Sequence, residues 1–231
     1  MRAWEGRGGE VTAATYHCHP GPGFRCLDMQ DEPAVRSLLN ELKPDFVSVP
    51  AANPFVDYCE LHPQETRRTN VAGTINVARA CAAAGLPMVF YSSDYVFDGV
   101  KGSYLEEDPV GPINEYGRQK AEVEEEVLRA CPRNIVVRTA GAYGWQWEPK
   151  NFVLQILANL KAGKPLKAAG DIRFSPTYVE NLADVVADLL EGGKAGLFHA
   201  VGADFMSGAQ FARLTAETFL LDASLIKEVS S

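Results

Sequence analysis

Short apolar runs alternate with segments of helical periodicity along the whole chain. The apolar runs predict strands at 11–16, 24–27, 45–49, 87–92, 134–138 and 197–201. Apolar residues spaced three and four apart predict helices at 33–42, 65–84, 115–130, 152–161, 179–191 and 208–220. Such βα alternation indicates an α/β protein built on a doubly wound parallel sheet with right-handed crossovers.

The pattern loosens toward the C-terminus. Beyond about residue 140 the predicted strands are fewer, and no Pro-, Gly- or Ser-rich linker separates this part from the rest. We therefore expect a single domain over 1–231, in which residues 140–231 contribute a smaller lobe interleaved with the sheet.

Composition narrows the class of protein. The chain has 231 residues, is 46% apolar and carries a formal charge of −8. Because no apolar run approaches a membrane span and no signal-peptide core is visible, we expect a cytoplasmic protein without membrane contact. Scattered Lys and Arg in an acidic chain argue against nucleic-acid binding. The five cysteines lack metal-ligand spacing and His17 and His19 lack a third ligand, so neither a metal site nor a disulfide is expected.

Two segments about two dozen residues apart carry the candidate chemistry. Ser93 follows the apolar run 88–91, where a buried parallel strand delivers side chains to its carboxyl edge. Tyr116 and Lys120 lie one turn apart on the same face of the predicted helix 115–130. A free phenol titrates at about 10, and a nearby ammonium is expected to lower that pKa. Tyr116 thus becomes a candidate general acid, with Ser93 holding a substrate oxygen, although a Tyr-Lys pair alone also occurs on ordinary surface helices.

The order of the motifs resembles the extended short-chain dehydrogenase/reductase family, within it the dTDP-4-dehydrorhamnose reductase group. The most specific segments are Ser92-Ser93-Asp94-Tyr95-Val96-Phe97-Asp98-Gly99 and Asn114-Glu115-Tyr116-Gly117-x-x-Lys120. Further matches are Ala51-Ala52, Asn70-Val71-x-Gly73-Thr74, Arg138-Thr139, Asn151-Phe152-Val153 and Ser175-Pro176-Thr177-Tyr178-Val179. The resemblance implies a Rossmann-type NAD(P)-binding fold in which residues 140–231 form the substrate-side lobe.

Carried over residue by residue, the resemblance assigns catalysis to Tyr116, Lys120 and Ser93. The residues that it assigns to the cofactor, NADP(H) or NAD(H), are Asp28, Met29, Ala51, Ala52, Asn70, Ser92, Lys120 and Arg138. Those that it assigns to a nucleotide-sugar substrate are Ser93, Asp94, Tyr95, Val96, Tyr116 and Asn151. Asp28 also fits an ordinary turn or helix-cap residue.

Two departures from the family pattern bear on ligands. A Rossmann-type domain opens with a strand and a glycine-rich phosphate loop, and Gly6-Arg7-Gly8-Gly9 does not fit that context. The fold expected here thus lacks its first strand and glycine-rich loop, and weak or no dinucleotide binding is predicted for a chain of this extent. Gly141 stands where the reductase pattern has an aromatic residue, which Trp145 or Trp147 could replace. The absence of a carboxylate in 14–19 favours NADP(H) over NAD(H).

The resemblance therefore predicts an NAD(P)H-dependent reductase of the keto group of a nucleotide-activated deoxysugar, acting as a homodimer. Two alternatives stay open. One is a non-catalytic regulatory subunit similar to the β subunit of methionine adenosyltransferase, and the other is a nucleotide-sugar epimerase that uses the same Tyr-Lys pair.

Overall fold

A computed structural model describes residues 2–15, 24–146 and 151–230. The chain divides into two compact units, the first made of Met1–Arg138 with Ala187–His199 and the second of Thr139–Val186 with Ala200–Ser231. The first boundary between the units lies next to residue 140, where the smaller lobe was expected to begin, but residues Ala187–His199 belong to the first unit. That the chain is a single domain stays a prediction.

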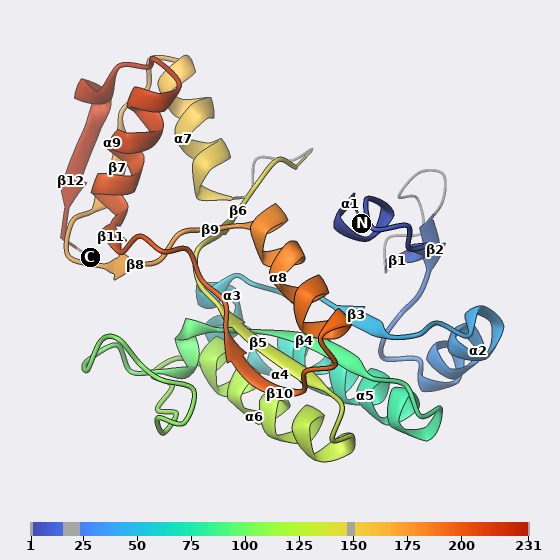
Figure 1. Cartoon of the computed structure of the whole chain (residues 1–231). Coiled ribbons are helices and arrows are strands. Elements are labelled where there is room, and N and C mark those ends of the chain that lie inside the picture. Colours follow the sequence, from blue (N-terminus) through green and yellow to red (C-terminus); the bar gives the residue numbers. More distant parts are fainter. Residues whose placement is uncertain (1, 16–23, 147–150, 231) are drawn as a thin grey trace. The chain divides into compact units, whose positions relative to one another are not determined.

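The first unit contains a sheet in the order β10-β5-β4-β3, formed by Gly196–His199, Ile135–Thr139, Met88–Ser93 and Val47–Val49. Val47 pairs in parallel with Met88, and Gly196 pairs in parallel with Ile135. A further parallel pair joins β1 (Ala13–Thr15) to β2 (Phe24–Cys26). The predicted α/β architecture with a parallel sheet is confirmed (Figure 1).

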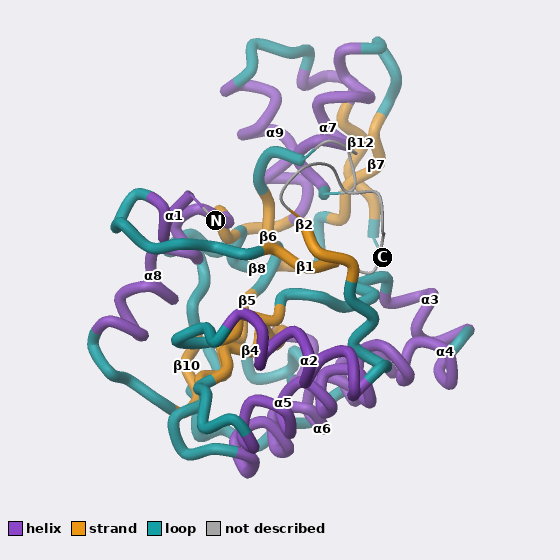
Figure 2. The backbone as a smooth tube through the Cα atoms, turned by 90° about the vertical axis from the view of Figure 1, so that its right-hand side faces the viewer, coloured by secondary structure: helices purple, strands orange, loops and turns teal. Residues whose placement is uncertain are grey.

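The two central strands form the core of this unit. Residues 88–90 and 135–137 are at most 1% exposed, as expected for parallel strands covered on both faces. Helices α5 (Thr74–Ala83) and α6 (Glu115–Ala130) lie side by side along the sheet (Figure 1 and Figure 2). Their apolar faces pack with α2 (Glu32–Leu42) and the strands into one buried cluster.

The predicted helix 65–84 is interrupted in the structure. It consists of α4 (Pro63–Arg67), a π-helical segment η1 (Arg68–Gly73) and then α5. A π-segment inserts an extra residue into the helical ladder and is frequent at functional sites. Two short helices, α1 (Arg2–Glu5) and α3 (Val56–Leu61), were not expected from the sequence.

The second unit is built from α7 (Phe152–Lys161), α9 (Gly208–Thr218) and pairs of short strands. Parallel pairs join β7 (Leu166–Ala169) to β12 (Ile226–Val229) and β6 (Ala142–Tyr143) to β9 (Thr177–Tyr178). An antiparallel pair joins β8 (Arg173–Phe174) to β11 (Met206–Ser207). The turns η2 (Asp94–Val96) and η3 (Ala223–Leu225) and helix α8 (Val179–Glu191), which passes from the second unit to the first, complete the described elements.

The cysteines differ in part from the sequence-based expectation. Cys26 is disulfide-bonded, contrary to the expectation of reduced thiols throughout, whereas Cys59, Cys81 and Cys131 are free and buried. Within the described ranges, no helix has the length and apolar character needed to cross a bilayer. His17, His19 and Trp147 lie outside the described residues.

Candidate active site

Strand β4 delivers Ser93 to its carboxyl end, as predicted. The Ser93 side chain is buried, and its hydroxyl donates to Asp94 Oδ1 at 2.9 Å. The Ser93 hydroxyl oxygen also accepts a hydrogen bond from the backbone N–H of Tyr95 at 3.3 Å, and this bond caps the turn η2. The hydroxyl is therefore held at a defined position at the sheet edge where α/β proteins bind ligands.

Helix α6 carries Tyr116 and Lys120 on its buried face. Asn114 caps the helix by accepting from the N–H of Gly117 at 2.8 Å. Tyr116 is 9% exposed and Lys120 5% exposed. The Lys120 ammonium donates to the carbonyl of Tyr91 at 2.7 Å and lies 5.6 Å from the centre of the Tyr116 ring. Phenol and ammonium are thus brought together beside strand β4.

Gly117 allows the serine segment and the tyrosine helix to approach closely. A Cβ atom at position 117 would overlap the carbonyl oxygen of Tyr95, so a larger residue requires the backbone to shift. The Tyr95 and Tyr116 rings meet edge to face with centroids 5.9 Å apart. The Tyr-Gly dipeptide of the motif therefore has a packing reason as well as a chemical one.

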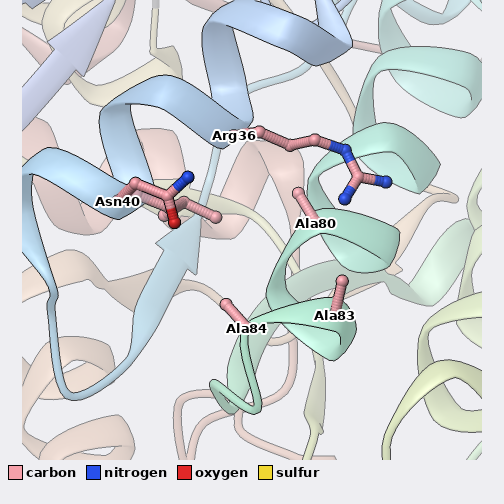
Figure 3. A pocket seen from close by; sticks show the side chains of 6 residues that line it. Arg36, Asn40, Ala80, Ala83 and Ala84 are labelled. Carbon is pink, nitrogen blue, oxygen red and sulfur yellow. The ribbon is translucent and has the colours of Figure 1, made fainter.

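An open groove shares Tyr95 with this cluster. Its volume is about 610 Å³, and it is lined by Phe55, Val56, Asp57, Tyr58, Leu61 and Tyr95. That volume is in the range of small-molecule sites. The exposed rings beside the buried phenol offer apolar faces to a ligand. A second hollow, between α2 and α5 in Figure 3, offers mainly alanine side chains and Arg36, which pairs with Glu32.

Burial dominates the proton equilibria of the cluster. Desolvation raises the pKa of Tyr116, and the neighbouring Cys59, Asp94 and Tyr95 raise it further. Desolvation lowers the pKa of Lys120 to about 8, against the opposing charge of Glu124. The predicted lowering of the tyrosine pKa by the lysine is therefore not what this environment produces. Instead, the phenol is held protonated at neutral pH, the state that a proton donor needs.

A network of buried amides surrounds the base of this cluster. Asn70, in the π-segment η1, donates to the Asn53 carbonyl at 3.1 Å and to Gln119 Oε1 at 2.8 Å. Its Oδ1 accepts from the Asn53 N–H at 2.7 Å. Gln119 was not among the predicted residues, because a glutamine in a helix rich in charged residues is expected to be a solvent-exposed side chain. Its position three residues after Tyr116, on the same face, is the signal that could have found it.

The predicted cofactor residues are arranged as follows. Ala51 and Ala52 follow β3, and Ser92 is buried with a hydroxyl that has no hydrogen-bond partner among the described residues. Small residues after a strand and a buried, unpartnered hydroxyl suit the ribose-nicotinamide part of a dinucleotide. The Asp28 carboxylate accepts a hydrogen bond from the N–H of Gln30 at 2.9 Å, as an ordinary turn residue does. Met29, the next residue, packs against Gly73. A cofactor role for each of them stays a prediction.

Arg138, a predicted cofactor residue, forms a buried ion pair within the protein. Its guanidinium donates to buried Glu124, with Nη2 to Oε2 at 2.6 Å and Nε to Oε1 at 2.9 Å. Nη1 donates to the carbonyl of Glu106 at 3.3 Å, and the group stacks on the Phe97 ring. These bonds engage Nε, Nη1 and Nη2, so a contact with cofactor would compete with an existing ion pair.

The predicted substrate residues differ in their exposure to solvent. Asp94 and Tyr95 are exposed beside Ser93, whereas Val96 is completely buried, so its side chain packs in the core and its substrate role stays a prediction. The 3-10 turn η2 rotates Val96 inward, which strand alternation does not anticipate. Asn151 caps α7 in the second unit by accepting from the Leu154 N–H at 3.1 Å, and its substrate role stays a prediction.

Position 141 lacks its own side chain because another ring occupies the space. Gly141 has a φ of 51°, and a Cβ there would overlap the Phe174 ring. Phe174 also meets Phe211 edge to face at 5.8 Å. The Phe174 ring thus fills the space next to position 141, whereas Trp145 is 69% exposed.

Several known proteins are similar to this chain in sequence. A probable low-salt glycan biosynthesis reductase, Agl14, of Haloferax volcanii is 31% identical, covering 95% of this chain and 75% of that protein. The dTDP-4-dehydrorhamnose reductase of Sinorhizobium fredii is 34% identical over 81% of this chain and 65% of its own. Methionine adenosyltransferase 2 subunit beta of Xenopus laevis is 31% identical over 90% and 65%. The chain thus spans less than two thirds of two of these relatives.

A solved structure extends the likeness to three dimensions. The crystal structure of dTDP-4-dehydrorhamnose reductase from Bacillus anthracis, in complex with NADP, superimposes with a TM-score of 0.85 at 28% identity, covering 89% of this chain and 72% of that one. The pattern of the family described as RmlD substrate binding domain matches residues 1–231. The chain therefore belongs to the RmlD substrate binding domain family, as its motifs predicted.

Proposed function

We propose that the protein is an NAD(P)H-dependent reductase of the keto group of a nucleotide-activated deoxysugar. One observation carries the proposal: the ring of Tyr116, which bears the hydroxyl, is buried beside the Lys120 ammonium, and Ser93 lies at the end of the adjacent strand. The reductase names of the relatives and the NADP of the Bacillus anthracis structure support it.

The residues divide the work in a way that their environments support. When bound, the dinucleotide supplies the hydride that no side chain can provide. Ser93 turns its hydroxyl proton from Asp94 Oδ1 to the substrate carbonyl oxygen and orients that oxygen toward Tyr116. As the carbonyl carbon is reduced, Tyr116 gives its hydroxyl proton to that oxygen, so the keto group becomes an alcohol. The Lys120 ammonium then faces the phenolate left behind, which a proton from water restores to phenol.

The amide groups and small residues place these parts. Ala51 and Ala52 leave room at the end of β3, and the N–H donors of Lys120 that remain beyond its bond to Tyr91 suit a ribose hydroxyl. Exposed Phe55 and Tyr95 line the groove next to the phenol and offer stacking faces for a sugar ring.

The test is conversion of a defined substrate. The protein is incubated with a dTDP-4-dehydro-6-deoxyhexose and NADPH deuterated at C4 of the nicotinamide, and the product is analysed by mass spectrometry and NMR. We expect one deuterium at C4 of the product sugar with equimolar NADPH oxidation. Recovery of unreduced keto sugar at full NADPH would contradict a reductase, and an epimerised sugar without net NADPH oxidation would favour the epimerase.

A second candidate rests on the similarity to methionine adenosyltransferase 2 subunit beta. In that case the fold serves as a docking surface for a catalytic subunit. Stoichiometric co-purification with a methionine adenosyltransferase catalytic subunit, without NADPH consumption on any keto sugar, would select this candidate. The cytoplasmic location and the homodimer stay predictions, which fractionation and sedimentation measurements can check.

A further inference from the structure

Gln119 is a fully buried amide in the helix that carries Tyr116 and Lys120. Its side chain is 0% exposed. Nε2 donates to Thr66 Oγ1 at 2.9 Å and to Glu115 Oε1 at 3.1 Å, and Oε1 accepts from Asn70 Nδ2 at 2.8 Å. Both donor protons and one acceptor site are therefore used, as a buried polar group requires.

Asn70 continues the network to the loop after β3. Its Nδ2 donates to the Asn53 carbonyl and its Oδ1 accepts from the Asn53 N–H, so both backbone groups of Asn53 are held. Asn53 directly follows Ala51 and Ala52, the small residues at the end of β3. The chain of contacts thus runs from the helix of the proton donor to the loop proposed to face the dinucleotide.

The orientation of each amide follows from the chemistry of its neighbours. The Asn53 N–H can only donate and its carbonyl can only accept, so Asn70 has one possible orientation. At the other end, Glu115 is paired with Arg67 at 3.3 Å and Arg118 at 3.1 Å. Burial acts to raise the pKa of Glu115, but the hydrogen bonds from Gln119, Arg118 and Arg67 outweigh it and lower that pKa.

An ionised Glu115 only accepts hydrogen bonds, so Gln119 must present Nε2 to it and Oε1 to Asn70. The two ends therefore agree, and donor meets acceptor between the two amides. A buried network in which every member is satisfied is rigid, and the loss of one member leaves the others unpaired.

We infer that Gln119 is a positioning residue that locks helix α6 to the Ala51–Asn53 loop and so fixes Tyr116 relative to the reacting carbonyl. The inference rests on the proposed reductase function. Gln119 itself contacts neither substrate nor cofactor in this scheme. Because displacement of a catalytic group by about 1 Å can lower a rate by up to ~10²-fold, a loosened link should reduce kcat more than it reduces ligand affinity.

The experiment compares Gln119→Leu with Val127→Ala in the full chain. Gln119→Leu removes the side-chain hydrogen bonds of position 119 to Thr66, Glu115 and Asn70 while filling similar volume. Val127 is also 0% exposed on α6, but its side chain makes only apolar contacts, so its variant controls for lost stability. Glu115→Gln, which lets the amide of Gln119 reverse, is a milder second variant in case Gln119→Leu does not fold.

Two readouts separate positioning from stability. The first is hydrogen exchange at the Asn53 N–H, and the second is kcat with NADPH and keto sugar at saturation. We expect Gln119→Leu to speed Asn53 exchange at least 10-fold and to lower kcat at least 10-fold, with Glu115→Gln smaller in both. Val127→Ala should change kcat less than twofold and speed Asn53 exchange only in proportion to its loss of Tm.

The outcomes distinguish this inference from the proposed function. If Gln119→Leu matches Val127→Ala in both readouts at equal Tm, the positioning role is overturned. Faster Asn53 exchange with an unchanged kcat also overturns it. If the wild type reduces no keto sugar, the reductase proposal fails, and protection at Asn53 still reports whether Gln119 holds the loop.

Discussion

Helix α6 carries two buried polar clusters that handle charge in opposite ways. Near its middle, Glu124 and Arg138 neutralise each other, and both side chains are about 5% exposed. Lys120, one turn nearer the start of the helix, is equally buried. Among the described residues, its ammonium donates a hydrogen bond to the neutral carbonyl of Tyr91. Burial lowers the pKa of Lys120 to about 8, and the nearby charge of Glu124 offsets this only in part. The carboxylate of Glu124 is engaged by Arg138, whereas the Lys120 ammonium has no ion-pair partner among the described residues and stays available for chemistry.

The largest expected effect comes from breaking the closed pair. Arg138→Met leaves Glu124 charged and buried, so we expect the free energy of unfolding to fall by about 3–5 kcal/mol. Urea denaturation followed by circular dichroism measures the change. The double variant Glu124→Gln with Arg138→Met should recover most of this loss, and a double variant as unstable as the single one would contradict the role given to the pair.

The next effect concerns the close approach at the active cluster. Gly117→Ala places a Cβ against the carbonyl oxygen of Tyr95, so the turn η2 or the start of α6 must shift. We expect a loss of about 1–3 kcal/mol, typical of overpacking, together with a lower kcat. Gly111→Ala is the matched control, because its Cβ would meet only Asp98 Cβ at 3.9 Å. Equal stability and activity in the two variants would argue against the tight contact.

A pH dependence distinguishes Lys120 from the paired charges. Its folded pKa, about 8, lies below the ordinary lysine value of 10.5. Between these values the unfolded chain binds more protons, so the contribution of Lys120 to stability rises with pH, by at most about 1.4 kcal/mol per unit. Above about pH 10 the raised pKa of Tyr116 acts in the opposite direction. The raised pKa values of the buried thiols Cys59 and Cys81 act in the opposite direction in this range, but equally with and without Lys120. Urea titrations from pH 7.5 to 9.5 should therefore show a slope that is more positive in the wild type than in Lys120→Met, and equal slopes would refute the assignment.

The smallest effect is expected on the solvent face of the same helix. Arg129 pairs with Glu126 and with Glu125, and these side chains are between about a third and three quarters exposed. Arg129→Ala should therefore change the free energy of unfolding by less than about 0.5 kcal/mol and leave kcat unchanged. A larger loss in thermal or urea unfolding would contradict the small contribution assigned to the exposed pairs of α6.

The parts of the fold that could be predicted are those with a strong local pattern. Strands β4 and β5 are continuous apolar runs because both their faces are covered, and α6 has an asparagine cap and a regular apolar face. The π-segment η1 could not be predicted, because its periodicity differs from that of an α-helix by only one inserted residue. The short strands of the second unit lack any pattern of their own and depend on pairing.

The candidate site shows the same limit. Ser93, Tyr116 and Lys120 could be found because their spacing expresses strand-end and helix-face geometry. Gln119 and the environment of Arg138 depend on partners far along the chain, at Asn70 and Glu124. The direction of the Tyr116 pKa depends on burial, which the motif does not encode. Motif spacing thus predicts which groups meet, and packing decides their protonation.

The central claim is that Tyr116 gives its proton to the substrate oxygen. The most direct measurement is single-turnover reduction of the keto sugar by wild type and Tyr116→Phe, with NADPH affinity measured in parallel by fluorescence. The variant keeps the ring against Tyr95 and removes only the hydroxyl. We expect the rate to fall by at least about 10²-fold with unchanged NADPH affinity. A Tyr116→Phe protein that reduces the sugar at the wild-type rate would contradict the account.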